Sequence, residues 1–287
     1  MILGASGRLG GTLVNQYDQR HQVIPRRRVE VDLNQPETLE AALAGADVEV
    51  VINAAALTSP DVCEDDPEQA RRVNADSPGR MAALCRQRGW RFIHLSTDYV
   101  FAGQGSALLD ETAEAHPVNA YGRSKREGEL AVLSANPEAL VARVSWLFGP
   151  QGGGMPETAL QRARAGQPLA FIEDKWSVPT STVDIAQWLE RLFTDLSGVQ
   201  GLLHLCNTGV ATWRDYAQVS LDLAHRHGLL ERAYPTQGCR LRDFPAFKAA
   251  RPPFTVMSNA RLAWLLGIAP DSWQVALDRH MASLAQR

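Results

Sequence analysis

The sequence predicts an α/β fold, a doubly wound parallel sheet followed by a smaller C-terminal α/β lobe. Three observations lead to this prediction. Short apolar segments alternate with longer segments of helical spacing, a glycine-rich turn follows the first apolar residues, and the part after residue 156 has fewer strand-like segments and ends in helical ones. Such alternation is typical of parallel strands joined by crossover helices.

The predicted strands are short apolar runs, and the predicted helices are longer segments with apolar residues three and four apart. Strand-like runs occupy residues 1–3, 22–25, 48–57, 91–96, 139–146, 169–172 and 202–207. Helical spacing occupies residues 67–88, 119–135, 182–196, 212–227, 258–267 and 272–285. Because a buried strand usually has about five residues, the first strand is either unusually short or begins upstream of Met1.

The clearest change in composition is GPQGGGMP at residues 149–156. Its glycines and prolines disfavour both helix and strand. We therefore place a domain boundary there, which gives a first domain over residues 1–148 and a second lobe over residues 149–287. Some segments of the second part are expected to return to the first domain.

Composition excludes several classes of function. The chain has 287 residues, a net charge of -3 and 21% charged residues, so bulk charge does not predict a nucleic-acid partner. No apolar run reaches the roughly 20 residues that a membrane span needs, and the four cysteines lie far apart, as reduced thiols of a cytoplasmic protein do. No spacing of His and Cys predicts a metal site.

The glycine-rich turn GASGRLG places Gly4, Gly7 and Gly10 between the first strand and the first helix. Glycines there allow backbone N–H groups to approach a pyrophosphate, as in a Rossmann-type domain. The next apolar segment ends at Arg26, Arg27 and Arg28, and arginines at this place favour a 2′-phosphate. We therefore expect NADPH as cofactor, with NADH as the alternative, and Asp32 near the adenine. An ordinary turn followed by a solvated basic segment is the competing interpretation.

Hydroxyl groups and a tyrosine-lysine pair form the predicted reactive centre. Ser96, Thr97 and Asp98 end a predicted strand at the edge where ligands bind in parallel sheets. In YGRSK, Tyr121 and Lys125 are four residues apart and share a helix face. The chain has only three lysines among 29 basic residues, so a lysine at this position is itself notable. A solvated helix pair is the alternative.

Together these motifs resemble the extended short-chain dehydrogenase/reductase superfamily, and within it the dTDP-4-dehydrorhamnose reductase family. The closest segments are NAAALT at 53–58, RVNADSPG at 72–79, STDYVF at 96–101, YGRSKREGE at 121–129, RVSWLFG at 143–149 and RPPFTVMS at 251–258. The resemblance implies reduction of the C4 ketone of a nucleotide-linked 4-keto-6-deoxysugar by NADPH, and a homodimer.

In that reaction Tyr121 would donate a proton to the developing oxyanion. The charge of Lys125 would lower the pKa of Tyr121, and its ammonium would also bind the nicotinamide ribose. Thr97, or less favourably Ser96, would orient the carbonyl group. These three side chains, Thr97, Tyr121 and Lys125, are the predicted catalytic residues.

The resemblance also implies residues that contact the two ligands. Cofactor contacts are expected from Gly4, Gly7, Arg8, Gly10, Arg26, Arg27, Asp32, Leu33, Ala54, Ala55, Asn74, Ser96, Tyr121 and Lys125. Substrate contacts are expected from Thr58, Thr97, Asp98, Tyr99, Trp146, Arg240 and Arg251. The two arginines would bind the diphosphate, because a guanidinium binds two phosphate oxygens at once. A core tryptophan and a basic surface loop are the competing interpretations of Trp146 and of the arginines.

Two other functions within the same fold stay open. Related sugar-nucleotide dehydratases carry Asp-Glu after the threonine, whereas this chain has Asp98-Tyr99, which disfavours dehydration. An epimerase would need the same tyrosine and lysine together with a tightly held cofactor. A binding subunit, like the regulatory subunit of methionine adenosyltransferase that resembles this family, would not need the complete set of Thr97, Tyr121 and Lys125. The segments GPQGGGMPE and DKWSVPT depart from the family pattern, which leaves the substrate's identity open.

Overall fold

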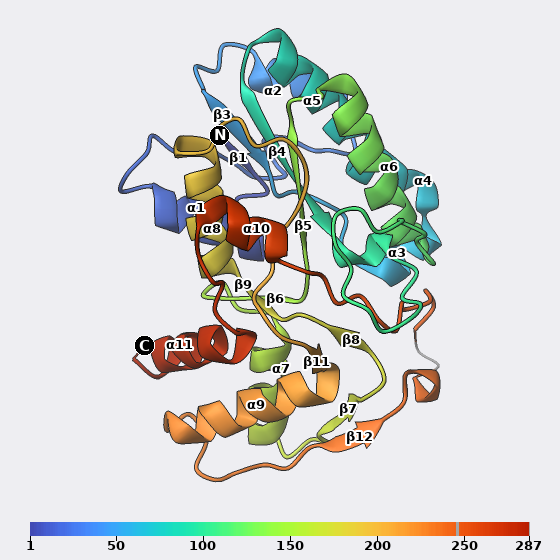
Figure 1. Cartoon of the computed structure of the whole chain (residues 1–287), viewed down its shortest axis with the longest axis vertical. Coiled ribbons are helices and arrows are strands. Elements are labelled where there is room, and N and C mark those ends of the chain that lie inside the picture. The colour runs from blue at the N-terminus through green and yellow to red at the C-terminus, as the bar shows by residue number, and fades with distance from the viewer. Residues whose placement is uncertain (245–246, 287) are drawn as a thin grey trace.

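The computed structural model describes residues 1–244 and 247–286. Its centre is a six-stranded sheet in the order β10-β5-β4-β3-β1-β2, and all neighbouring strands run parallel. Helices cover both faces of this sheet, and a second lobe lies beyond the carboxyl ends of its strands (Figure 1). The predicted fold class is confirmed.

The central sheet consists of β1 (Ile2–Leu3), β2 (Pro25–Arg26), β3 (Val50–Asn53), β4 (Arg91–Thr97), β5 (Leu140–Val144) and β10 (Gly201–His204). The helices that cover it are α1 (Arg8–Tyr17), α2 (Thr38–Leu43), α5 (Ser77–Gln87), α6 (Ala120–Ala135), α8 (Thr182–Thr194) and α10 (Ala260–Leu266). The helices α3 (Pro60–Asp65) and α4 (Pro67–Arg71) and the π-helix η1 (Arg72–Asp76) precede α5, and the 3-10 helix η2 (Asp98–Val100) follows β4.

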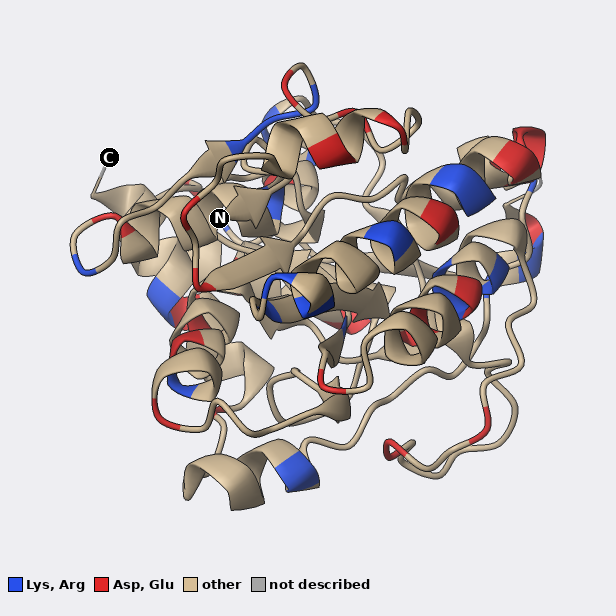
Figure 2. Ribbon diagram, turned by 90° about the horizontal axis from the view of Figure 1, so that it is seen from above, with Lys and Arg blue, Asp and Glu red and all other residues tan. Residues whose placement is uncertain are grey.

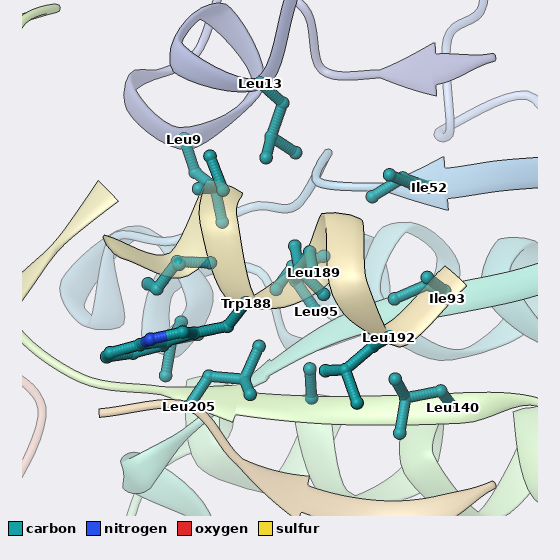
Figure 3. Close-up of a cluster of buried hydrophobic side chains, with 14 of the residues drawn as sticks. Leu9, Leu13, Ile52, Ile93, Leu95, Leu140, Trp188, Leu189, Leu192 and Leu205 are labelled. Atoms are coloured by element: carbon teal, nitrogen blue, oxygen red, sulfur yellow. The ribbon is translucent and has the colours of Figure 1, made fainter. Parts of the chain in front are cut away.

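Successive residues of each strand point to opposite faces of the sheet, which divides the apolar core into two layers. Ile52 and Ile93 pack against α1, α8 and α10, together with Leu13 and Leu189 (Figure 3). Their neighbours in sequence, such as Val51 and Phe92, pack on the other face among residues of α2, α5 and α6. The continuous apolar runs of the sequence therefore correspond to strands that are buried on both faces.

Close backbone packing holds α6 against the helical segment before it. A Cβ atom at Gly128 would lie 2.0 Å from the carbonyl oxygen of Asn74, and one at Gly122 would lie 2.2 Å from that of Tyr99. Both distances are shorter than any real contact, so only glycine permits this approach. The packing fixes α6 relative to the end of β4.

The second lobe is built around its own apolar cluster, which includes Phe148, Tyr216, Leu221, Trp273 and Leu277. Its elements are β6 (Leu147–Phe148), α7 (Met155–Arg164), β7 (Ala170–Ile172), β8 (Trp176–Ser177), β9 (Thr180–Ser181), β11 (Ala211–Thr212), α9 (Trp213–Arg226), β12 (Gln237–Cys239), the 3-10 helix η3 (Leu241–Asp243) and α11 (Trp273–Ala285). Its strands pair two by two, as β11-β8, β12-β7 and β6-β9.

The chain crosses between the two parts more than once. After β9, helix α8 packs on α1, and β10 then pairs with β5 at the edge of the central sheet. Helix α7 begins at Met155, inside the segment predicted to lack helix, because a proline in the first helical turn has no hydrogen bond to lose. The first strand has two residues, and the amino group of Met1 donates to Val50 O at 2.7 Å.

Charged residues of both signs are interspersed over the helices (Figure 2). Within residues 1–244 and 247–286, no helix is long and apolar enough to cross a membrane. The same residues contain no group of three His, Cys, Asp or Glu side chains that could hold a metal ion.

Candidate active site

A cavity of about 660 Å³ lies at the carboxyl ends of the central strands. Its wall comes from the turn between β1 and α1, the segments that follow β3, β4 and β5, and the first turns of α6. It adjoins the switch point of the sheet, because β1 has β2 on one side and β3 on the other. This is where ligands bind in doubly wound folds.

The glycine-rich turn forms part of the cavity wall. Gly4 has a φ of 74°, and a Cβ atom there would lie 2.7 Å from Ala55 N. Gly7 is the N-cap of α1, so the first N–H groups of this helix have no side-chain cap. Gly4, Gly7 and Arg8 line the cavity, which fits a diphosphate at the positive end of α1.

Gly10 has a different place from the one predicted. It is buried outside the cavity wall, and a Cβ atom there would lie 2.1 Å from the carbonyl oxygen of Gly4. Gly10 therefore allows α1 to pack against the turn and shapes the cavity from behind.

Among Arg26, Arg27 and Arg28, only Arg28 lines the cavity. Its Nε lies 3.6 Å from Asp32 Oδ1, and its side chain is 76% exposed. Nη1 of Arg26 lies 3.7 Å from Oε1 of Glu30, and Arg27 is exposed. Neither of these two predicted cofactor residues lines the cavity. The short strand β2 ends at Arg26, and the chain turns before Arg28 reaches the cavity. Asp32 and Leu33 line the wall.

The segment after β3 forms the neighbouring part of the wall with Ala54, Ala55, Leu57 and Thr58. Asn74 lies behind it and is fully buried. Its side chain accepts from Leu57 N at 2.9 Å and donates to Leu57 O at 2.9 Å and to Ser124 Oγ at 3.0 Å. The amide thus joins this wall segment to α6, and Asn74 is placed as a support of the wall and not in its lining.

Thr97 and Tyr121 meet at the cavity wall. Thr97 is the last residue of β4 and Tyr121 lies in the first turn of α6, whose N-cap Asn119 accepts from Gly122 N. Burial raises the pKa of Tyr121, and a hydrogen bond with Thr97 acts in the opposite direction. The prediction that the pKa of Tyr121 is lowered is therefore wrong, because a buried phenolate lacks hydration.

Lys125 lies one turn further along α6 and is buried at 2% exposure. Its Nζ donates to Leu95 O at 2.7 Å and lies 3.3 Å from Nε2 of His94. Burial lowers the pKa of Lys125 to about 8, and the nearby carboxylate of Glu129 opposes this shift. Both neighbours of the ammonium belong to β4, so this strand positions the lysine at the cavity wall.

Ser96 lines the cavity, but its hydroxyl group is already engaged. It donates to Glu129 Oε1 at 2.7 Å, and the same carboxylate binds Nε and Nη2 of Arg143 at 2.7 Å each. Glu129 and Arg143 are both buried. Of the two candidate hydroxyl groups, Thr97 is the one placed beside Tyr121.

The cavity is also lined by Thr58, Asp98, Tyr99 and Trp146. Trp146 has a φ of 39°, the one positive value outside glycine among the described residues. Such a backbone conformation is strained for a bulky residue and persists only where the surroundings enforce it. A second cavity of about 280 Å³ shares Arg8, Trp146 and Leu147 with the first.

The predicted diphosphate arginines lie elsewhere. Arg251 pairs with Asp61, with Nη2 at 2.7 Å from Oδ2. Arg240 is exposed, and neither arginine lines the cavity. Arg251 is engaged because the fold brings it to α3, 190 positions earlier in the chain, which no local pattern announces.

Sequence reasoning missed several buried residues that support the site, namely His94, Glu129, Arg143 and Lys175. The signal for Lys175 was available, since it is one of only three lysines in the chain. Glu129 and Arg143 had no such signal, because a buried ion pair depends on which faces of α6 and β5 the fold brings together.

Comparison with known proteins agrees with this geometry. The sequence matches the family described as "RmlD substrate binding domain" over residues 1–286. The chain belongs to this family. The predicted resemblance is confirmed.

Relatives of similar length carry reductase names. One is the dTDP-4-dehydrorhamnose reductase of Burkholderia thailandensis, which is 32% identical over 288 residues and 96% of each chain. Another, from Streptomyces antibioticus, is named a probable dTDP-4,6-dihydroxy-2-methyloxan-3-one 4-ketoreductase and is 36% identical over 96% of this chain and 92% of its own. The crystal structure of a dTDP-4-dehydrorhamnose reductase from Clostridium acetobutylicum superposes with a TM-score of 0.90 at 30% identity, covering 100% of this chain and 99% of its own. The predicted oxidoreductase class is confirmed.

Proposed function

We propose that this protein reduces the C4 ketone of a nucleotide-linked 4-keto-6-deoxysugar with NADPH, and that the sugar is dTDP-4-dehydrorhamnose. One observation carries the proposal. A single cavity is lined by the glycine-rich turn and Arg28, by Thr97, Tyr121 and Lys125, and by Tyr99 and Trp146.

The residues around the glycine-rich turn fit the cofactor. The N–H groups at the start of α1 suit its diphosphate, and the guanidinium of Arg28 suits a 2′-phosphate beside Asp32, which favours NADPH over NADH. Lys125 lies at the wall where its ammonium would hold ribose hydroxyl groups. Bound NADPH supplies the hydride that reduces C4.

Tyr121 completes the reduction by donating its hydroxyl proton to the ketone oxygen. The overall change is ketone plus NADPH plus one proton to secondary alcohol plus NADP⁺. The upward shift of the pKa of Tyr121 suits this direction, because the phenol keeps its proton at neutral pH until the substrate oxygen develops negative charge. Thr97, which is hydrogen-bonded to Tyr121, holds the phenol in place for this step.

The part of the cavity wall that contains Tyr99 and Trp146 is proposed to bind the sugar. The aromatic faces of Tyr99 and Trp146 suit the apolar side of a 6-deoxyhexose. The names of the relatives agree on a dTDP-linked 4-keto substrate but differ in the sugar, so the sugar is the finer part of this proposal. A homodimer, expected from the resemblance, and a cytoplasmic location, expected from the widely spaced cysteines, belong to the proposal as well.

The deciding experiment follows NADPH absorbance with purified protein and dTDP-4-dehydrorhamnose generated in situ, in parallel with NADH. Rapid oxidation of NADPH with formation of a dTDP-6-deoxyhexose would support the proposal. If folded protein that binds NADPH oxidises none of it, the reductase assignment with this sugar is refuted. Protein that retains NAD through purification and interconverts sugars without net oxidation would instead be an epimerase.

A further inference from the structure

Lys175 is a buried cation just outside the wall of the cavity. It lies between β7 and β8, and its exposure is 0%. Its Nζ donates to Pro252 O at 2.7 Å. A buried ammonium needs compensation, because the loss of hydration costs far more than one hydrogen bond returns.

Two aromatic rings of the cavity wall provide part of that compensation. Nζ lies 4.9 Å from the ring centroid of Tyr99 and 5.7 Å from that of Trp146, within the range of cation–π attraction. Both residues line the cavity. Lys175 therefore supports from behind the two rings that face the substrate, including the strained Trp146.

The compensating negative charge belongs to Asp98, which is 2% exposed. Burial raises the pKa of Asp98, and the positive charge of Lys175 opposes that rise. Conversely, burial lowers the pKa of Lys175 to about 8, Asp98 opposes this shift, and the charge of Arg251 reinforces it. Asp98 and Arg251 are thus the charged groups whose fields act on Lys175.

The charge state of Asp98 decides how the hydroxyl group of Thr97 is oriented. As a carboxylate, Asp98 accepts at Oδ2 from Ser177 at 2.9 Å and from Thr255 at 2.5 Å, and at Oδ1 from Thr97 at 3.2 Å. The Thr97 oxygen in turn accepts from Tyr99 N at 3.2 Å. A protonated Asp98 could donate to Thr97, which would turn the hydroxyl hydrogen of Thr97 elsewhere.

We propose that Lys175 is a positioning residue of the active site. Its charge keeps Asp98 an acceptor, which orients Thr97, and its ammonium fixes the rings of Tyr99 and Trp146 that receive the sugar. The inference rests on the proposed function, since Thr97 and the rings matter to a ketosugar. It adds a residue that touches neither substrate nor cofactor.

A double-mutant cycle of Lys175→Met and Asp98→Asn tests this proposal through kcat, KM and the pH profile. Lys175→Met should lower kcat/KM for the ketosugar about 10- to 100-fold, the effect of a lost positioning contact, with the KM for NADPH unchanged. The pH dependence of kcat/KM should also shift. In the Asp98→Asn background the same Lys175 change should alter kcat/KM less than about threefold, because residues that act through one another are not additive.

The matched control is Arg162→Met. It also removes a cation from an aromatic ring, that of Phe171 at 5.4 Å, but on α7 and outside the cavity wall. It should leave both KM values and the pH profile unchanged. Wild-type kinetics in Lys175→Met, or two effects that simply multiply in the double variant, would overturn the proposal.

Two further comparisons keep the test decisive. If Lys175→Met does not fold, the double variant, which has lost both charges, is compared with Asp98→Asn alone. If the wild-type protein reduces no ketosugar, the proposed function fails separately. Urea unfolding of the four proteins then decides whether Lys175 and Asp98 are coupled, and independent effects on stability would refute the coupling.

Discussion

Tyr121 combines two properties at the residue scale, a buried phenol and a hydroxyl neighbour, Thr97, that hydrogen-bonds to it. Its ring packs edge-on against Tyr99 with centroids 5.6 Å apart. A phenylalanine side chain at this position keeps the ring contact and loses only the hydroxyl group. Substitution at this position therefore separates proton donation from packing.

We expect Tyr121→Phe to lower kcat for ketosugar reduction by about 10²- to 10⁴-fold, the usual contribution of a positioned acid. NADPH binding, followed by fluorescence titration, should change little. Tyr234→Phe, which removes a phenol hydroxyl in the second lobe outside the cavity wall, serves as control and should keep the wild-type rate. A Tyr121→Phe variant as fast as wild type would exclude Tyr121 as the acid.

Arg28 decides cofactor choice in our proposal, because it is the arginine of its segment that lines the cavity. Arg28→Met should raise the KM for NADPH about 10- to 100-fold, since a charge-assisted hydrogen bond to phosphate contributes about 1.5–3 kcal/mol. The KM for NADH should stay within about twofold. Arg27→Met, an exposed neighbour, is the control, and equal effects of both substitutions would contradict a specific contact by Arg28.

At the scale of elements, the sequence patterns locate the site but not its supports. The i, i+4 spacing of Tyr121 and Lys125 and the polar end of β4 follow from local periodicity, and both elements form where expected. The pairing of Arg251 with Asp61 and the approach of Lys175 to Asp98 join distant parts of the chain. Such contacts depend on tertiary packing, which one sequence does not encode in any short pattern.

The central strands carry two buried neutral histidines, His94 in β4 and His204 in β10. Burial lowers the pKa of His94 far below its usual value and that of His204 to about 3. Below a pH of about 6.5 the unfolded chain takes up protons that these folded residues do not. Linkage therefore requires the free energy of unfolding to fall as pH falls.

We expect the free energy of unfolding to fall below a pH of about 6.5 by up to about 1.4 kcal/mol per pH unit for each histidine. The amino group of Met1, whose pKa burial lowers from 8.0 to about 6, acts in the same direction between those two values. Urea unfolding between about pH 5 and 6.5 measures the slope. His204→Gln should make this slope smaller, because one proton fewer is taken up on unfolding. An unchanged slope would mean that His204 is protonated in the folded protein.

At the scale of the whole molecule, Arg8 joins the first domain to the second lobe. It begins α1 beside the glycine-rich turn, and its guanidinium donates to Leu147 O at 3.0 Å, to Gly152 O at 2.8 Å and to Gly153 O. These carbonyl groups belong to β6 and to the glycine loop before α7. The side chain of Arg8, beside the glycine-rich turn, therefore holds a loop of the second lobe.

We expect Arg8→Met to lower the free energy of unfolding by about 1.5–3 kcal/mol, since hydrogen bonds to a charged donor are lost. It should also raise the KM for the ketosugar, because Trp146 adjoins the loop that Arg8 holds. This effect is expected although Arg8 itself lies beside the glycine-rich turn. Arg8→Lys keeps the charge without the planar fork and should recover only part of both effects. Steady-state kinetics with each substrate varied, together with urea unfolding, measures these changes. A loss confined to NADPH affinity, with normal stability and a normal KM for the sugar, would show that Arg8 serves the cofactor alone and does not link the two lobes.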